Sequence, residues 1–440
     1  MLIDRIGPMD LTVLVADRGA VPTNLGVVLL FGESAPGAAE LLELMRTRIA
    51  RIPRLRQVLR RTPVGCGRPV WADDPSFTVD RHVAVIEVPD GEVLGVAASL
   101  LCRPFDPRRP LWRAVVATGA GRNALIVVAH HVVVDGIGGL AVLAALADEW
   151  PSTGPHRPFP LPAPSPRALA SDATRARLRA LGSLPGDLRR AVAGLRELGG
   201  RPRRAERISL VRPTSDRRAL ARVTVPLDRV VAAAHRAGGT VNDVVLCAVT
   251  GAMTAVLRAR GEHPGQLVVS VPVSGRSSAG PGPDRLGNNT GVRPIAVPAV
   301  PDEGTRLAAI VAVTREQRSS AQRAASAGPL GVAFRALGRA GLLRVFIDHQ
   351  RLVHTFETNL RGPGTVMHLA GRRVSELVPM VATPGNTGVT FAALSYAGAL
   401  TVTVIADPVI VPEHDALATA VQQTFTNLTC EPDSRPVSLT

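Results

Sequence analysis

One short segment, built around two adjacent histidines, constrains the fold of this chain more than any other. Ala124–Ala129 is an apolar run of strand length, and His130 and His131 follow it directly. Asp135 and Gly136 then give a turn signal, and the residues after them repeat apolar side chains at helical spacing. The sequence therefore predicts a buried strand that ends on an imidazole, followed by a sharp turn and a helix.

The two histidines have different expected roles, because consecutive side chains of a strand point to opposite faces of the sheet. They cannot both reach the same substrate or hold the same metal ion. His131 lies closer to the turn, where a ligand can approach, so we expect it to be a general base. His130 is then expected to pack in a structural role.

The turn after the histidines carries two further expectations. Asp135 organises the site, either by accepting backbone hydrogen bonds or by pairing with a distant arginine, for which Arg276 is one candidate among many. Gly136 suits a turn that needs a positive φ or a close approach of another segment.

Eight other segments accompany this motif in a fixed order along nearly the whole chain. They are Arg51–Arg56, Pro69–Phe77, Arg103–Trp112, Val241–Leu246, Val271–Ser274, Gly287–Asn289, Thr358–Pro363 and Leu394–Gly398. With the HHxxxDG motif they resemble the wax ester synthase/diacylglycerol acyltransferase family, which lies within the superfamily of chloramphenicol acetyltransferases and nonribosomal peptide condensation domains.

The N-terminal segment departs from the usual family pattern. Gly7–Asp10 and Thr23–Gly26 stand where the family has a Pro-Leu-Ser-like segment and a Met-His pair, and only 3% of the residues are aromatic. An acyl channel would therefore have mainly aliphatic walls. Two alternatives stay open: transfer to a hydroxyl or amine of a specialised metabolite, and an inactive binding or scaffold protein of the same fold.

The resemblance implies an α/β fold of two chloramphenicol acetyltransferase-like domains, each a mixed sheet with helices, around an active-site tunnel. A length of 440 residues also favours two domains. We expect an N-terminal domain over 1–160 with the HHxxxDG motif, a Pro- and Arg-rich crossover over 161–205, and a C-terminal domain over 206–440.

The mechanism implied by the resemblance needs neither a metal ion nor a covalent intermediate. His131 takes a proton from the hydroxyl of a diacylglycerol or a long-chain alcohol, and the oxygen attacks the thioester of acyl-coenzyme A. Acyl-coenzyme A is thus a co-substrate, and no bound cofactor is expected. The four cysteines show no metal-ligand spacing.

Three asparagines are candidate substrate-binding residues. Asn242 is the predicted N-cap of a helix over Asp243–Arg260, where free backbone amides could also meet an anion. Asn288 and Asn359 lie in segments with glycine and could donate to a carbonyl or a pantetheine amide. Turn formation is the alternative role for both.

The formal net charge of +15 comes from arginine alone, since the sequence contains no lysine. No basic stripe interleaved with aromatic residues is present, so we expect no nucleic-acid partner. The 161–205 segment contains a basic amphipathic pattern, which indicates either a linker helix packed on the domains or docking on an anionic membrane or lipid-droplet surface. The absence of a signal pattern and of a long apolar run predicts a cytoplasmic protein, or one peripheral at the inner membrane face.

Two enzyme classes fit poorly. Gly136–Ala141 matches a dinucleotide-binding glycine pattern, but the following Pro-rich stretch lacks the acidic residue that such a site needs. Gly275–Ala279 lies in a Gly/Pro/Ser-rich loop and is not the strand-to-helix elbow of a serine hydrolase.

Overall fold

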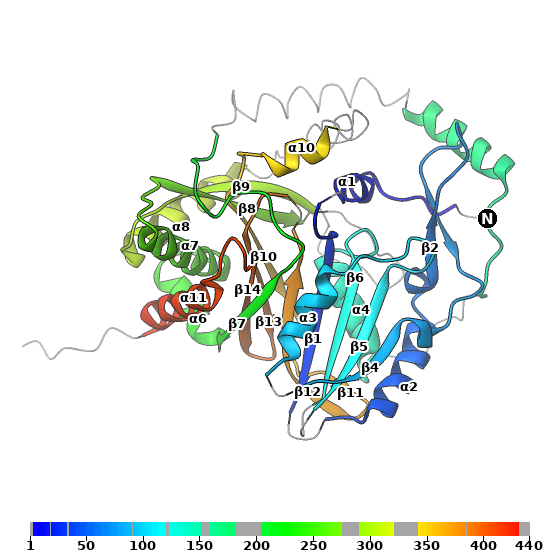
Figure 1. The fold of residues 1–440 in the computed structure, drawn as a ribbon, viewed down its shortest axis with the longest axis horizontal. Helices are drawn as coiled ribbons and strands as arrows, with labels where there is room; N and C mark the ends of the chain where they lie inside the picture. Colours follow the sequence, from blue (N-terminus) through cyan, green and yellow to red (C-terminus); the bar gives the residue numbers. More distant parts are fainter. Residues whose placement is uncertain are drawn as a thin grey trace, which may run out of the picture.

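Two six-stranded sheets lie side by side in the computed structural model (Figure 1). It describes residues 3–17, 19–32, 35–89, 91–119, 123–150, 158–180, 204–274, 290–320, 342–383 and 385–430. The predicted α/β class, with two mixed sheets and packed helices, is confirmed.

The first sheet has the strand order β11-β12-β1-β6-β5-β4. Its strands are β1 (Asn24–Phe31), β4 (Val83–Glu87), β5 (Trp112–Thr118), β6 (Ala124–His130), β11 (His368–Leu369) and β12 (Arg372–Val381). β6 is antiparallel to both β1 and β5, and Asn24 lies opposite His130. The central position of β6 explains its uninterrupted apolar sequence, because both of its faces are buried.

Helices cover both faces of the first sheet. α2 (Ala38–Ile49) and α4 (Gly136–Leu146) share one apolar core with β1, β5 and β6. α3 (Val93–Cys102) packs on the opposite face. α1 (Pro8–Ala16), the short helices η1 (Pro53–Arg56) and η2 (Val79–Arg81), and the hairpin β2 (Gln57–Arg60) and β3 (Val70–Asp73) complete this half, with a further helical segment over 166–180.

The second sheet has the strand order β7-β14-β13-β10-β8-β9. Its strands are β7 (Ala219–Pro226), β8 (Gln266–Ser274), β9 (Thr290–Pro298), β10 (Thr355–Arg361), β13 (Val389–Tyr396) and β14 (Ala399–Ala406). Its helices are α6 (Leu227–Arg236), α7 (Val241–Ala259), α8 (Glu303–Ser320), α10 (Leu343–Asp348) and α11 (His414–Thr429). α6, α7, α8 and α11 gather on the outer side of this sheet, at the left of Figure 1.

α7 is the central helix of the second core. Within the described part of the chain it is the one helix long and apolar enough to cross a membrane by length and composition. Val244, Leu246, Val249, Met253 and their neighbours are nonetheless buried against the sheet and the adjacent helices. Packing inside the protein accounts for its apolar sequence.

The two halves of the chain are joined through their sheets. β12 comes from the second half of the sequence but pairs with β1 in the first sheet. Glu376 on β12 accepts hydrogen bonds from Arg222 and Thr224 on β7 of the second sheet. Leu394 and Tyr396 on β13 belong to the apolar core of the first sheet. The region between the sheets is therefore a packed junction.

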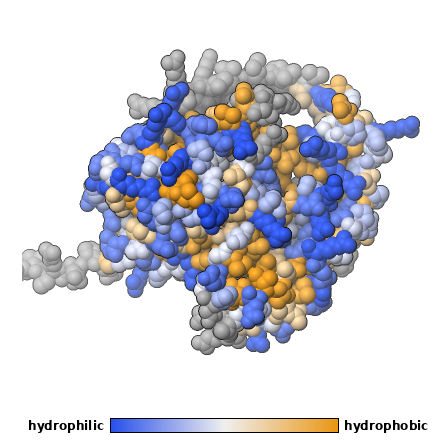
Figure 2. All heavy atoms as spheres, viewed as in Figure 1, coloured by the Kyte–Doolittle hydropathy of each residue, from blue (hydrophilic) through white to orange (hydrophobic). Residues whose placement is uncertain are grey.

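Two strands predicted in the second half of the chain are confirmed. Leu267–Val273 lies within β8 (Gln266–Ser274). Thr401–Ala406 is also a strand, but its polar–apolar alternation does not mark an exposed face, because Thr401 and Thr403 are buried. The crossover prediction is only partly described, since residues 181–203 lie outside the described ranges. In Figure 2, hydrophobic residues gather at the lower centre of the visible face, with hydrophilic residues around them.

Candidate active site

His131 is the first residue after β6, where the chain leaves the centre of the first sheet. Its N–H donates to the carbonyl of Thr23 at 2.9 Å, which fixes the backbone at this point. The side chain is half-buried. Its Nδ1 is buried and has no hydrogen-bond partner among the described residues. A buried ring nitrogen without a partner is uncommon in folded proteins, and a functional role is one explanation for it.

The surroundings of His131 favour its neutral form. Burial lowers the pKa of His131, and the polar backbone of His131 itself and the negative charge of nearby Asp135 oppose this only in part. A neutral imidazole keeps one ring nitrogen with a lone pair at neutral pH. Such a group can take a proton from a hydroxyl.

His130 has a different environment. Its side chain is buried, its Nδ1 accepts a hydrogen bond from the N–H of Val132 at 3.1 Å, and its Nε2 donates to Asp17 Oδ2 at 2.9 Å. These two bonds use both ring nitrogens and define the tautomer with the proton on Nε2. Both ring nitrogens of His130 are therefore occupied by hydrogen bonds within the protein, whereas Nδ1 of His131 has no partner among the described residues.

Asp135 begins α4 as its N-cap. Its Oδ1 accepts from the N–H of Gly138 at 2.8 Å, and the side chain is buried. This satisfies one of the free amides of the first helical turn and fixes the direction in which the chain leaves the site. Arg276, the suggested partner, lies outside the described residues.

Gly136 is required by a close approach and has no positive φ. A Cβ at this position would lie 2.8 Å from Cδ1 of Leu360 on β10. The HHxxxDG turn of the first half thus touches a strand of the second sheet. A side chain at this position would force the Leu360 side chain to shift.

The three candidate asparagines have separate outcomes. Asn242 is the second residue of α7, and the N-cap is Thr240, which forms a reciprocal capping box with Asp243. The predicted N-cap was wrong because the capping box begins two residues earlier. Asn359 lies within β10, half-buried, where a glycine-containing loop was expected. Asn288 lies outside the described residues.

Sequence patterns did not assign a role to Asp17 or Glu357, and Thr23 and Leu360 entered only as members of longer segments. Asp17 and Thr23 bond to the histidine pair, and Leu360 contacts Gly136. Glu357 on β10 is fully buried, and neither carboxyl oxygen has a hydrogen-bond partner within the described ranges. No spacing reveals these contacts, since Asp17 and His130 are 113 residues apart.

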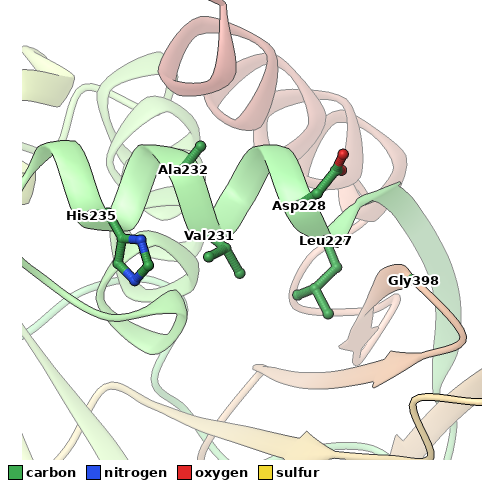
Figure 3. Close-up of a pocket in the computed structure, with 6 residues that line it drawn as sticks. All are labelled: Leu227, Asp228, Val231, Ala232, His235 and Gly398. Carbon is green, nitrogen blue, oxygen red and sulfur yellow. The ribbon is translucent and has the colours of Figure 1, made fainter.

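A pocket lies along α6, away from the turn after His131. Leu227, Val231 and His235 project to one side of the helix there, and Gly398 closes the end of the pocket (Figure 3). Among the described residues that line it, Asp228 and His235 are the ionisable ones. Across the described ranges, no three His, Cys, Asp or Glu side chains gather as metal ligands.

Two family models match the chain. The wax ester synthase/diacylglycerol acyltransferase catalytic domain matches residues 6–245, and the WS/DGAT C-terminal domain matches residues 286–429. A probable diacylglycerol O-acyltransferase of Mycobacterium tuberculosis H37Rv is 28% identical over 95% of this chain and 94% of the relative. A putative diacylglycerol O-acyltransferase of the CDC 1551 strain is 31% identical over 72% of this chain and 70% of the relative.

Solved structures share the fold. The wax ester synthase/diacylglycerol acyltransferase from Marinobacter aquaeolei VT8 superposes with a TM-score of 0.68 at 20% identity, over 96% of this chain and 98% of that one. The first condensation domain of the calcium-dependent antibiotic synthetase gives 0.64 at 18% identity, over 98% and 97%. At these identities the likeness is one of fold alone.

Proposed function

The chain belongs to the wax ester synthase/diacylglycerol acyltransferase family, and from this premise we propose that it moves a fatty acyl group from acyl-coenzyme A to a hydroxyl acceptor. The acceptor is diacylglycerol or a long-chain alcohol. One observation carries the proposal: His131 directly follows β6, burial lowers its pKa, and its Nδ1 has no hydrogen-bond partner among the described residues.

The reaction uses His131 as a general base. The neutral imidazole takes the proton of the acceptor hydroxyl while the oxygen attacks the thioester carbonyl. The tetrahedral intermediate collapses, the carbon–sulfur bond breaks, and the imidazolium returns the proton to the departing thiolate of coenzyme A. An ester and free coenzyme A result, with no acyl group on the enzyme. A positioned general base of this kind contributes about 100- to 10,000-fold to the rate.

The remaining motif residues orient this base. Asp135 caps α4, and Gly136 lets β10 approach, so the turn after His131 is fixed from both halves of the protein. Asn359 lies one residue before Leu360, which touches Gly136, and this neighbourhood supports a role for its amide in binding substrate. Asn242 and Asn288 stay candidates for the same task.

Acyl-coenzyme A enters as a co-substrate, without a separate bound cofactor. The excess of arginine suits the phosphates of coenzyme A and an anionic membrane or lipid-droplet surface, which the 161–205 segment would meet. The protein then works in the cytoplasm, at or near the inner face of the membrane.

The test is release of free thiol from palmitoyl-coenzyme A by the purified protein, with diacylglycerol, hexadecanol or no acceptor. We expect release only when a lipid acceptor is present, and the matching ester on chromatography. The lipid assignment would be contradicted if diacylglycerol and hexadecanol gave no thiol release while a polar hydroxyl or amine did. A complete lack of release with every acceptor would contradict the enzymatic one.

A further inference from the structure

The carboxylate of Asp17 sits at the centre of a hydrogen-bonded clamp. Asp17 is the C-cap of α1, and its two oxygens have different partners. Oδ1 accepts from the N–H of Thr23 at 2.6 Å, and Oδ2 accepts from Nε2 of His130 at 2.9 Å. One acidic side chain therefore holds both the segment before β1 and the end of β6.

Both partners of Asp17 pass the constraint to the backbone around His131. The carbonyl of Thr23 accepts from the N–H of His131 at 2.9 Å. Nδ1 of His130 accepts from the N–H of Val132 at 3.1 Å. These N–H groups belong to the two peptide units on either side of the His131 Cα. These two units set the direction of the Cα–Cβ bond of His131 and limit the rotamers that its ring can adopt.

We propose that Asp17 is a positioning residue for the base: its carboxylate, acting through Thr23 and His130, fixes both peptide units that flank His131. The inference rests on the proposed function, since it concerns His131 as the base. Asp17 itself need not touch the substrate.

The clamp requires an acceptor at both oxygens of residue 17. Thr23 N–H and His130 Nε2–H are both donors, and a carboxylate offers two acceptors. His130 cannot turn its proton to Nδ1, because that nitrogen already accepts from Val132. An amide in place of the carboxylate would set an NH₂ group against one of the two donors in either orientation.

The carboxylate of Asp17 stays ionised although it lies in a largely buried place. The side chain of His130 is 6% exposed and that of Asp17 is 22% exposed. Burial works against the charge, but hydrogen bonds from His130 and Thr23 hold the pKa of Asp17 below its usual value. Asp17 is therefore a carboxylate throughout the neutral range.

The test compares Asp17→Asn with a matched control, Asp148→Asn. Asp148 also accepts two backbone N–H bonds, from Ala370 and Gly371, but has no contact with the histidine pair. For Asp17→Asn we expect kcat to fall about 100-fold, the loss that a displacement near 1 Å of a reacting group can cause. KM for both substrates and the acid limb of the pH profile should not move, and Asp148→Asn should keep the wild-type kcat.

A double variant separates positioning from general weakening of the fold. If Asp17 acts in large part through His130, then Asp17→Asn combined with His130→Ala loses far less than the product of the two single losses. The inference would be overturned if the loss of kcat in the double variant equalled the product of the two single losses. It would also be overturned if folded Asp17→Asn kept the wild-type kcat. An acid limb shifted by Asp17→Asn would also overturn it, since charge and not geometry would then link Asp17 to His131.

A measurement independent of turnover tests the clamp even if no acyl transfer is found. Nitrogen-15 NMR of the wild-type histidines should show His130 as the Nε2–H tautomer with a protected proton, and Asp17→Asn should lose that protection. A wild-type His130 with its proton on Nδ1 would overturn the inference. Lack of turnover by the wild type with an intact clamp would instead count against the proposed function.

Discussion

Replacing Glu357 with glutamine should make the stability of the protein depend less on pH. Glu357 lies on β10, is fully buried, and has no hydrogen-bond partner at either oxygen in the part of the chain that the structure describes. Burial raises its pKa from the usual 4.5 to about 8. The folded protein therefore keeps this carboxyl protonated at neutral pH, whereas the unfolded chain ionises it.

The sign and size of the effect follow from these two pKa values. Below 4.5 both states bind the proton, so the group adds no pH dependence. As the pH rises toward 8, only the unfolded state gains by releasing the proton, and the folded state is destabilised. At about 1.4 kcal/mol per pH unit, the loss is about 1 kcal/mol at pH 5 and about 4 kcal/mol at pH 8.

The assay is urea unfolding of wild type and Glu357→Gln between pH 5 and pH 8. Glutamine stays neutral, so the free energy of unfolding of the variant should rise by about 3 kcal/mol relative to that of the wild type between pH 5 and pH 8. Contributions from histidines are common to both proteins and cancel in the difference. Glu87→Gln, at an exposed position on β4, is the control and should show no such gain. A difference that stays constant with pH would refute the reasoning.

Three further predictions concern the turn, the base and the second core. Gly136→Ala should cost about 1–3 kcal/mol in urea unfolding because its Cβ meets Leu360, and adding Leu360→Ala should recover part of the loss; an equal loss in both would contradict the contact. The acid limb of kcat/KM against pH should have an apparent pKa below 6.5, since burial lowers the pKa of His131; a value above 6.5 would argue against this base. Thr240→Ala should cost about 1 kcal/mol of stability through the lost cap, with kcat unchanged, and an unchanged melting temperature would contradict the capping role.

The local part of the site could be predicted from the sequence. The apolar run before His130, the turn at Asp135 and the helix after Gly136 are all encoded by neighbouring residues, and they form β6 and α4. Asp135 accepts a backbone hydrogen bond, one of the two roles expected for it. The reason for Gly136 was open between two options, and its contact with Leu360 decides for close approach.

The long-range part could not be predicted. Spacing does not show that Asp17 bonds to His130, or that β12 crosses into the first sheet to pair with β1. The segment around Asn359 is polar and contains glycine, which favours a loop. Asn359 nevertheless lies in a strand, because β13 pairs with β10 in parallel. Thr403 is polar and yet buried, because β14 is covered on both faces.

The most direct test of the account is ester formation from palmitoyl-coenzyme A and diacylglycerol or hexadecanol by wild type and by folded His131→Ala. His263→Ala, at an exposed position after α7, is the matched control. We expect ester from wild type and from the control, and a loss of about 100-fold or more in His131→Ala with an unchanged melting temperature. Undiminished ester formation by His131→Ala would contradict the assignment of His131 as the general base.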